Sequence, residues 1–337
     1  MKAAVHHRYG PPEVVTVTDV PTPVPRDDEV LVRIRAATVG VVDSLARRGT
    51  PRYARVHFGV RRPRFPVLGS DFAGVIEAAG PSVTRFAVGD EVFGTTAPRF
   101  GAHAEYARMS QDAALEPKPA GLSFPEAAAL ADGTALCFLR DKANLRRGQA
   151  ILVNGASGAV GTVAIQLARH FGATATGVCG GASAGLVRDL GASAVIDYTQ
   201  ADFTRAGQVY DVIFDVAGQS SFARCRAILA STGIYLTTAP GPAIFVQMPW
   251  TARFGSKKAV VAFTGLRSPG AKRADLRYTA ELVASSELAA VIDACYPLER
   301  IADAYRHVDA GHKKGNVIVT MTGPAGSGPG PAGRGGR

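Results

Sequence analysis

Apolar and polar positions alternate in short runs through the first third of the chain. Between residues 29 and 39, apolar side chains occupy every second position from Val30 to Ala36, and Arg33 and Arg35 stand between them. A period of two is typical of a strand with one buried face. Further strands are predicted over residues 3–7, 14–20, 70–80, 89–94 and 103–109. Glycine and proline separate these runs, so we predict a mainly β domain with a barrel-like sheet.

The pattern changes at residue 123. Ser123 and Glu126 form a capping box around Pro125, which predicts a long helical stretch toward Leu145. Beyond it, helices alternate with strands predicted at 151–156, 173–178, 194–197, 210–218, 233–238 and 257–265. Six strands separated by helices are typical of a parallel, doubly wound Rossmann sheet, so the predicted fold class is α/β.

The end of the chain has no place in that six-stranded sheet. We therefore assign residues 286–322, which include an apolar strand at 316–321, to the first domain together with residues 1–122. Residues 123–285 form the predicted Rossmann domain. The tail, residues 323–337, is rich in glycine and proline and has almost nothing to bury, so we expect it to be disordered.

The composition is that of a globular protein, because 47% of the 337 residues are hydrophobic and 20% are charged. No apolar run reaches the roughly 20 residues of a membrane span, and the N-terminus lacks the apolar core of a signal peptide. We therefore expect a cytoplasmic protein without a membrane partner. The cysteines lie far apart, which predicts reduced and mostly buried side chains. They are Cys137, Cys179, Cys225 and Cys295.

The formal net charge of +10 raises the question of a nucleic-acid partner. The arginines and lysines are scattered and are not laid along one helix with aromatic residues between them, so we expect a solvated basic surface and no nucleic acid. Attraction of a polyanionic cofactor is a second interpretation of the charge.

A glycine-rich turn follows the first predicted Rossmann strand. Gly158 lets the backbone approach a pyrophosphate, Gly161 permits close packing of helix and strand, and the N-terminus of the helix that follows offers free N–H groups. Such a turn is a weak signal alone, but here it stands between a strand and a helix. The predicted cofactor contacts are Ala156, Ser157, Gly158, Ala159, Val160 and Gly161, with Val216 from a later strand end.

The second Rossmann strand ends at Cys179 and Gly180, without the carboxylate that NAD enzymes place there. A 2′-phosphate would meet no acidic side chain in this run, so NADPH is favoured over NADH. Ser183 and Tyr198 can donate hydrogen bonds to that phosphate. Alternatively, Ser183 caps its helix and Tyr198 packs at a strand end.

Several stretches carry a resemblance to a known family. They are MKAAVHHRYGPPEVV at the start, PVLGSDFAGVIEAAGPSVTRFAVGDEVFG, AHAEYA, SFPEAAAL with GTAL, NGASGAVGTVAIQLAR, LGASAVIDY and HKKGNVIV. Over nearly the whole chain, the sequence resembles the zinc-independent quinone oxidoreductase branch of the medium-chain dehydrogenases/reductases. The resemblance implies a GroES-like β-barrel catalytic domain, a cofactor in the cleft between the domains, and a homodimer.

Zinc-dependent relatives hold zinc through cysteine and a His-Glu pair. At the matching places this chain has residues 40–43 and 69–71, which offer no sulfur or imidazole. We therefore expect no metal site, and Asp71 is interpreted as a hydrogen-bonding group at a strand end. The chain also departs from quinone reductases at Gly40-Val41 and Leu45, which implies an altered substrate pocket, and at Ala182, where relatives often carry Lys or Arg.

Hydride transfer without a metal favours acceptors such as enones, enoyl thioesters and quinones, whose developing charge is easiest to stabilise. Thr134 is expected to hold the nicotinamide or the substrate oxygen, unless its hydroxyl bonds back to a helix carbonyl. Asp132 is either a proton donor raised in pKa by burial or a solvated aspartate. Asp43 is expected to support the structure. Tyr53 and His103 are expected near the cleft mouth, where each either packs or acts as an acid.

Two further features concern assembly. The apolar segment 240–254 is either a lid over the substrate or a buried interface segment, and the strand 259–264 is the expected edge of the sheet, where a second copy would pair. Two alternatives to the enone or quinone reductase stay open. One is a carbonyl or alcohol oxidoreductase that acts on a secondary-metabolite intermediate. The other is a non-catalytic NADPH-binding regulator or RNA binder.

Overall fold

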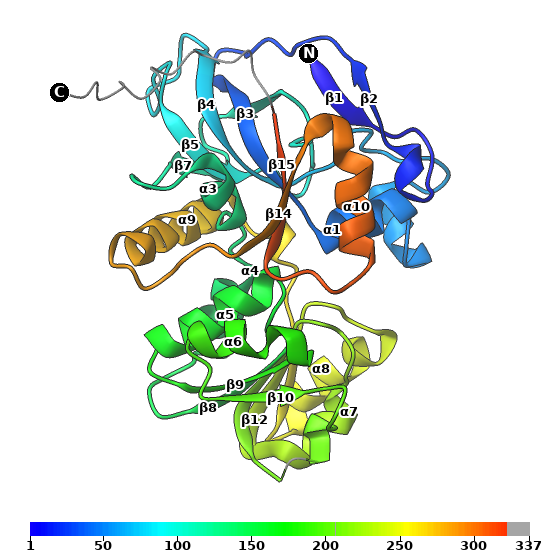
Figure 1. Cartoon of the computed structure of the whole chain (residues 1–337), viewed down its shortest axis with the longest axis vertical. Helices are drawn as coiled ribbons and strands as arrows, with labels where there is room; N and C mark the ends of the chain where they lie inside the picture. The colour runs from blue at the N-terminus through cyan, green and yellow to red at the C-terminus, as the bar shows by residue number, and fades with distance from the viewer. Residues whose placement is uncertain (206, 322–337) are drawn as a thin grey trace, which may run out of the picture.

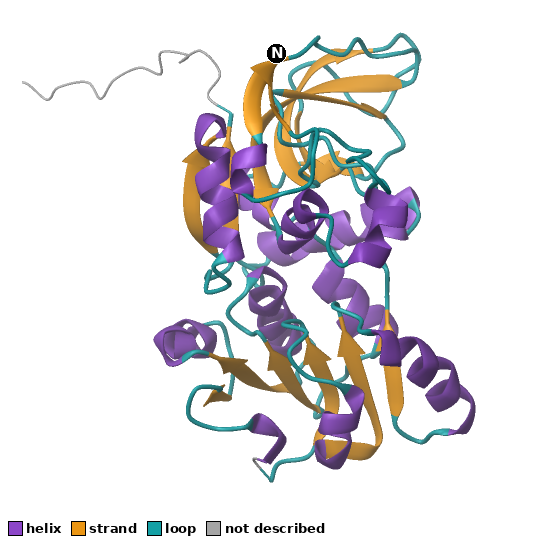
Figure 2. Cartoon of the chain, turned by 90° about the vertical axis from the view of Figure 1, so that its right-hand side faces the viewer, coloured by secondary structure: helices purple, strands orange, loops and turns teal. Residues whose placement is uncertain are grey.

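The computed structural model describes residues 1–205 and 207–321. The tail at 323–337, for which we expect disorder, lies outside the described residues. Two sheets lie one above the other along the long axis, and helices pack between and around them (Figures 1 and 2). None of the described helices is long and apolar enough to cross a membrane.

The upper sheet is built around strand β3 (Glu29–Val39), which pairs antiparallel with strands from three parts of the chain. The main path of the sheet is β14 (Ile292–Pro297), β15 (Asn316–Thr320), β3, β4 (Asp71–Ala79), β5 (Glu91–Thr95) and β7 (Leu115–Pro117), with β6 (Tyr106–Ser110) also on β3. Val30, Val32 and Ile34 are buried, which confirms the alternation of the sequence. The short strand β7 was not predicted from the sequence.

The predicted strands near the N-terminus, β1 (Lys2–Val5) and β2 (Thr16–Asp19), form a separate two-stranded sheet. Isolated bridges such as Ala3 to Ala104 link this small sheet to the rest of the domain, and Ala4 packs in the same hydrophobic cluster as Val30 and Val32 of β3. At the other end of the chain, β15 pairs with β3, so the chain returns to the first sheet.

Helices α1 (Val41–Arg48) and α10 (Ile301–Asp309) are joined by a buried arginine. The side chain of Arg47 is fully buried, its guanidinium donates to the Gly10 carbonyl at 2.7 Å, and it forms an ion pair with Asp309. The ring of Tyr305 lies 5.0 Å below the guanidinium carbon. This arginine therefore belongs to the domain core and not to the solvated basic surface.

The lower sheet is parallel throughout and has the order of a doubly wound Rossmann sheet, as predicted. Its strands run, across the sheet, as β10 (Ala194–Asp197), β9 (Thr174–Cys179), β8 (Ala150–Asn154), β11 (Tyr210–Asp215), β12 (Leu229–Thr237) and β13 (Lys258–Val261). The helices of this domain are α5 (Ala159–His170), α6 (Ala184–Asp189), α7 (Phe222–Cys225), α8 (Pro242–Phe254) and α9 (Pro269–Ala284).

The predicted long helix toward Leu145 is wrong, although its capping box is present. The Ser123 amide donates to Glu126 Oε2 at 2.8 Å, and α3 (Phe124–Ala129) follows. The helix then stops, and the Asp132 carboxylate accepts from the Thr134 amide at 2.9 Å to begin α4 (Thr134–Leu136). Residues 130–133 thus separate two short helices. A π-helix over 137–142 completes this region.

Two helices that the sequence places in the Rossmann domain also pack on the upper sheet. Ala127 of α3 and Leu276 of α9 share a buried cluster with Ala36, Phe93 and Ile318. These two helices therefore contribute side chains to the core of the upper domain, although the sequence assigns them to the Rossmann domain. The two hydrophobic cores are not divided sharply at the predicted domain boundaries.

The segment 240–254 does not lie over the cleft. Residues 242–254 form α8, which packs against the edge strand β13, and only Pro240 and Gly241, which precede this helix, line the cleft between the domains. Its exposed apolar side chains are Phe245, Val246, Trp250 and Phe254. The lid alternative is therefore wrong, and the alternative of an interface segment stays a prediction.

Candidate active site

A cleft of about 1690 Å³ separates the two sheets. Its lower wall is formed by the carboxyl ends of β8, β9 and β11, where parallel α/β sheets bind their ligands. Its upper wall is formed by α1, the start of β4 and the loop after β5. Representative lining residues are Asn154, Gly158, Cys179 and Val216 below, and Thr38, Asp43, Leu45 and Asp71 above.

The glycine-rich turn is tight at one end and open at the other. Gly155 has a positive φ of 87°, and a Cβ on Gly161 would lie 2.1 Å from the Gly155 carbonyl oxygen, so both positions require glycine. Gly158 is the N-cap of α5, with no cap from a side chain, and a Cβ there would meet nothing closer than 3.5 Å. The helix N-terminus therefore presents free amides to the cleft, an arrangement suited to a phosphate.

Most of the predicted cofactor contacts line this cleft. They are Ser157, Gly158, Ala159, Val160, Cys179, Gly180, Ser183, Tyr198, Val216 and Thr134. Ala156 and Gly161 do not line it, and the prediction of direct contacts for them is wrong. Ala156 is fully buried and its amide donates to the Val178 carbonyl at 3.0 Å, while Gly161 packs against the turn.

The region after β9 contains two hydroxyls and one unexpected carboxylate. Ser183 stands at the N-cap of α6 without a side-chain cap bond, so its hydroxyl is available to the cleft. Tyr198 is 54% exposed, and its hydroxyl lies 3.4 Å from the position of a Cβ on Gly180. Asp197, at the end of β10, lies beside Gly181 and accepts from the Thr199 amide at 2.9 Å, and these bonds lower its pKa. The sequence of β9 alone could not reveal this neighbour.

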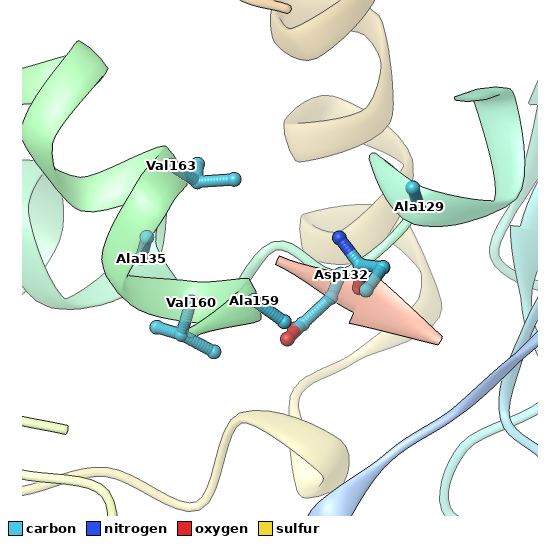
Figure 3. Close-up of a pocket in the computed structure, with 7 residues that line it drawn as sticks. Ala129, Asp132, Ala135, Ala159, Val160 and Val163 are labelled. Carbon is cyan, nitrogen blue, oxygen red and sulfur yellow. The ribbon is translucent and has the colours of Figure 1, made fainter. Parts of the chain in front are cut away.

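Thr134 begins α4 at the middle of the cleft. Its hydroxyl bonds to the Thr264 hydroxyl at 3.0 Å, so the alternative of a bond back to a helix carbonyl is not realised. Its amide is bound by Asp132, and both residues line the cleft. Asp132 also borders a separate small cavity beside Ala159 and Val160 of α5 (Figure 3). Thr264, which sequence reasoning missed, thus fixes the orientation of Thr134.

Asp43 supports the structure. Its carboxylate accepts from the Gly40 amide at 2.8 Å and from the Gly69 amide at 3.0 Å, and it is buried. Burial raises its pKa, whereas His103 and these amides act in the opposite direction. Both carboxylate oxygens are thus engaged in holding the start of α1 to the turn before β4.

Of the two residues expected near the cleft mouth, only Tyr53 is there. Its side chain is exposed, and its hydroxyl donates across the cleft to the Pro240 carbonyl at 3.2 Å. His103 is a buried core residue, with Nε2 2.9 Å from the Thr38 carbonyl oxygen and Nδ1 3.3 Å from the Tyr305 hydroxyl. Burial lowers its pKa. The placement of His103 at the mouth is therefore wrong, and its packing alternative holds.

Asp71 is more than a strand-end group. It stands at the start of β4 and lines the cleft together with Asp132 and Lys272. Burial, and next the negative charge of Asp132, raise its pKa to about 8. Lys272 reaches in from α9 and donates to the carbonyls of Ala97 at 2.8 Å and Gly265 at 2.6 Å. Sequence reasoning missed this group because its members come from three distant segments.

The donor set does not fit a catalytic zinc ion. No group of three or more His, Cys, Asp or Glu side chains that could hold a metal occurs within residues 1–205 and 207–321. In the described part of the chain all four cysteines are free, and only Cys295 is exposed. The residues that match the zinc ligands of relatives, such as Ser70, provide neither sulfur nor imidazole.

The barrel-like upper sheet, the parallel lower sheet and the cleft with its glycine turn together define a two-domain dehydrogenase/reductase. Residues 26–120 match the alcohol dehydrogenase GroES-like domain, and residues 190–319 match a family described as zinc-binding dehydrogenase.

Relatives that match nearly the whole chain show to which branch of this family it belongs. The chain is 31% identical to a chloroplastic quinone-oxidoreductase homolog of Spinacia oleracea, covering 95% of this chain and 98% of that protein. It is 30% identical to the human quinone oxidoreductase, with the same coverage. The quinone oxidoreductase of Coxiella burnetii superposes with a TM-score of 0.84 at 26% identity, over 96% of this chain and 99% of that one. The chain belongs to the quinone oxidoreductase branch of the medium-chain dehydrogenases/reductases and is an oxidoreductase.

Proposed function

We propose that this protein is a zinc-free, NADPH-dependent reductase of quinones or of activated C=C bonds such as those of enones. One observation carries the proposal: the open glycine turn and the polar group formed by Asp71, Asp132 and Thr134 face the same cleft. A relative from Solanum lycopersicum, 33% identical over 95% of this chain and 79% of its own length, is named 2-methylene-furan-3-one reductase. That name agrees with an enone substrate.

The cleft fits a nicotinamide dinucleotide. The amides of residues 159 and 160 in the first turn of α5 would hold the pyrophosphate, and Ser183 with Tyr198 would reach the adenosine ribose and its phosphate. Thr134, oriented by Thr264, would position the nicotinamide or the substrate oxygen. When bound, the nicotinamide supplies a hydride. The protein contributes proximity and hydrogen bonds to the oxygen on which negative charge grows.

An activated acceptor suits this donor set better than a simple alcohol. An alkoxide needs strong electrostatic support, which zinc supplies in metal-dependent relatives. The enolate that forms from an enone spreads its charge and can be supported by hydroxyl and carboxyl donors. The polar groups of the cleft are of that kind.

The test is NADPH oxidation with a panel of quinones, enones, aldehydes and alcohols. Quinone or enone turnover without added metal, unaffected by a chelator, supports the proposal. Turnover of aldehydes or alcohols alone would favour the carbonyl oxidoreductase. Salt-sensitive RNA binding without turnover of any acceptor would favour the non-catalytic regulator.

NADPH is proposed over NADH because the cleft residues that follow β9 are hydroxyls and small side chains. Asp197 lies close, but its carboxylate is engaged by Thr199 and Gly181. No lysine or arginine occupies residues 179–183, so we expect the preference for NADPH to be modest.

Ala182→Lys is expected to lower the Kd for NADPH roughly tenfold while changing that for NADH less than about twofold, because an ammonium would pair with the 2′-phosphate alone. Ala182 is exposed and can take a long side chain without a clash. Fluorescence titration with both coenzymes measures the effect, and Ala182→Gln is the uncharged control of similar length. An equal gain for NADH would contradict this placement of the phosphate.

We also propose a cytoplasmic homodimer that forms through β13. This strand is at one edge of the six-stranded sheet, and α8 beside it exposes Phe245, Val246, Trp250 and Phe254. An exposed apolar helix next to an unpaired strand edge is suited to bind a second copy of the chain.

Trp250→Glu is expected to convert the dimer to monomers in sedimentation experiments, because the introduced charge would be desolvated at the interface. Trp250 is 65% exposed in the single chain. Val24→Glu, on an even more exposed apolar position in the first domain, should leave the dimer intact. A wild-type protein that sediments as a monomer would refute the proposed assembly.

A further inference from the structure

Asp71 has an incomplete set of hydrogen-bond partners in the upper wall of the cleft. It faces Thr95 across β4 and β5, and the Thr95 hydroxyl donates to its carboxylate. The Ala97 amide donates to that hydroxyl oxygen at 3.2 Å, so the hydroxyl hydrogen is free for Asp71. Within the described residues, no other hydrogen bond is made to this carboxyl group. The carboxyl group can therefore form further hydrogen bonds with a molecule in the cleft that it lines.

The charges around Asp71 disfavour its ionised form. Asp132 and Asp43 are negative neighbours, and Lys272 is the positive one. Burial lowers the pKa of Lys272, while the charges of Asp71 and Asp132 act in the opposite direction, and its ammonium donates to two backbone carbonyls. Asp132 in turn faces Lys313 and Asp275, and burial raises its pKa.

When two carboxyl groups repel each other in a partly buried cleft, the pKa of one of them is raised. Asp132 already accepts the Thr134 amide, a bond that favours its charged form, so the proton resides on Asp71. The pKa of Asp71, raised to about 8, agrees with this assignment. A carboxylic acid that is protonated at neutral pH and open to the substrate space is suited to general-acid catalysis.

We propose that Asp71 donates the proton that completes reduction of an activated C=C bond, an inference that rests on the proposed function. Hydride addition to the β-carbon of the acceptor moves the π electrons into an enolate. The enolate pair then takes the proton from the Asp71 carboxyl group, forming a C–H bond at the α-carbon and breaking the O–H bond. Asp71 is left as a carboxylate beside Lys272, and water restores its proton after the product leaves.

The position of Asp132 suggests how Asp71 is kept protonated. Figure 3 shows the Asp132 carboxylate between the start of α5 and the break after α3. Fixed there by the Thr134 amide, it holds its negative charge near Asp71. Asp132 is therefore assigned as a positioning residue that sets the pKa of Asp71, rather than as the proton donor.

Asp71→Asn is expected to lower kcat for an enone roughly 100-fold, the usual contribution of a general acid. The Kd for NADPH should stay unchanged, because Asp71 lies in the upper wall of the cleft and the glycine turn in the lower one. Quinone reduction should change less than about threefold, because a hydroquinone oxygen takes its proton from water. Asp19→Asn, on an exposed position at the end of β2, is the control.

The pH dependence gives a second readout. Wild-type kcat for an enone should fall above about pH 8, because the acid form of Asp71 is lost as the pH passes its raised pKa. Asp132→Asn removes a negative charge near Asp71, so Asp71 should ionise more easily. The fall in kcat should therefore begin at a lower pH in this variant. In the coenzyme-free protein, a carbon-labelled aspartate carboxyl resonance should titrate near pH 8 and be missing from Asp71→Asn.

The outcomes separate this proposal from the proposed function. If Asp71→Asn reduces enones at the wild-type rate, or if Asp132→Asn leaves the pH profile unmoved, Asp71 is not the donor although the protein is still a reductase. If the wild-type protein reduces neither quinones nor enones, the proposed function itself fails. Should Asp71→Asn not fold, the Asp132→Asn profile and the wild-type carboxyl titration decide the matter.

Discussion

Gly158→Val is expected to raise the Kd for NADPH at least about 100-fold while the free energy of unfolding stays almost unchanged. Gly158 has a φ of −79°, which any residue adopts, and a Cβ at this position meets nothing closer than 3.5 Å. The branched side chain would therefore not disturb the protein. It would project into the cleft and occupy the space where phosphate oxygens must approach the amides of α5.

Calorimetric titration measures this loss, and Gly270→Val is the matched control. Gly270 lies in the first turn of α9, is exposed, and has open space around its Cβ position. It does not line the cleft, so its variant should bind NADPH as the wild type does. A Gly158→Val protein with unchanged affinity would show that the dinucleotide phosphates do not rest on this turn.

Arg47→Ala is expected to lower the free energy of unfolding by about 3 kcal/mol or more, the second large effect. The fully buried guanidinium bonds to the Gly10 carbonyl at 2.7 Å and to Ser44 at 3.2 Å, and pairs with Asp309 of α10. Truncation would leave the carbonyl without a donor, the carboxylate without its ion pair, and a cavity against Tyr305.

Arg48→Ala provides the control in the adjacent position. Arg48 is exposed and forms no ion pair within the described residues, so its loss should change stability by less than about 0.5 kcal/mol. Urea denaturation of both variants measures the difference. Equal stabilities would mean that Arg47 does not join α1 to α10 in solution.

The strands and the cofactor turn were predictable because their signals are local. The alternation from Val30 to Ala36 reports one buried face, and the six strands of the Rossmann sheet are each bounded by glycine or polar residues. The roles of Gly158 and Gly161 followed from their spacing between a strand and a helix. These features depend on neighbours within a few residues in the sequence.

The failures of prediction have two causes. The long helix after Ser123 breaks locally, where the Asp132 carboxylate binds the Thr134 amide two residues further on. The other failures arise from contact between distant segments: the ring of His103 meets Thr38 and Tyr305, and the role proposed for Asp71 depends on Asp132 and Lys272. No local pattern in the sequence encodes these distant contacts.

Deuterium transfer tests the central claim most directly. The wild-type protein is incubated with NADPH that carries deuterium at the hydride-donating face of C4, together with an enone, and the product is analysed by mass spectrometry and NMR. The account predicts one deuterium at the β-carbon, a solvent proton at the α-carbon, and no dependence on added metal. A product without deuterium, or no reduction of any quinone or enone, would contradict it.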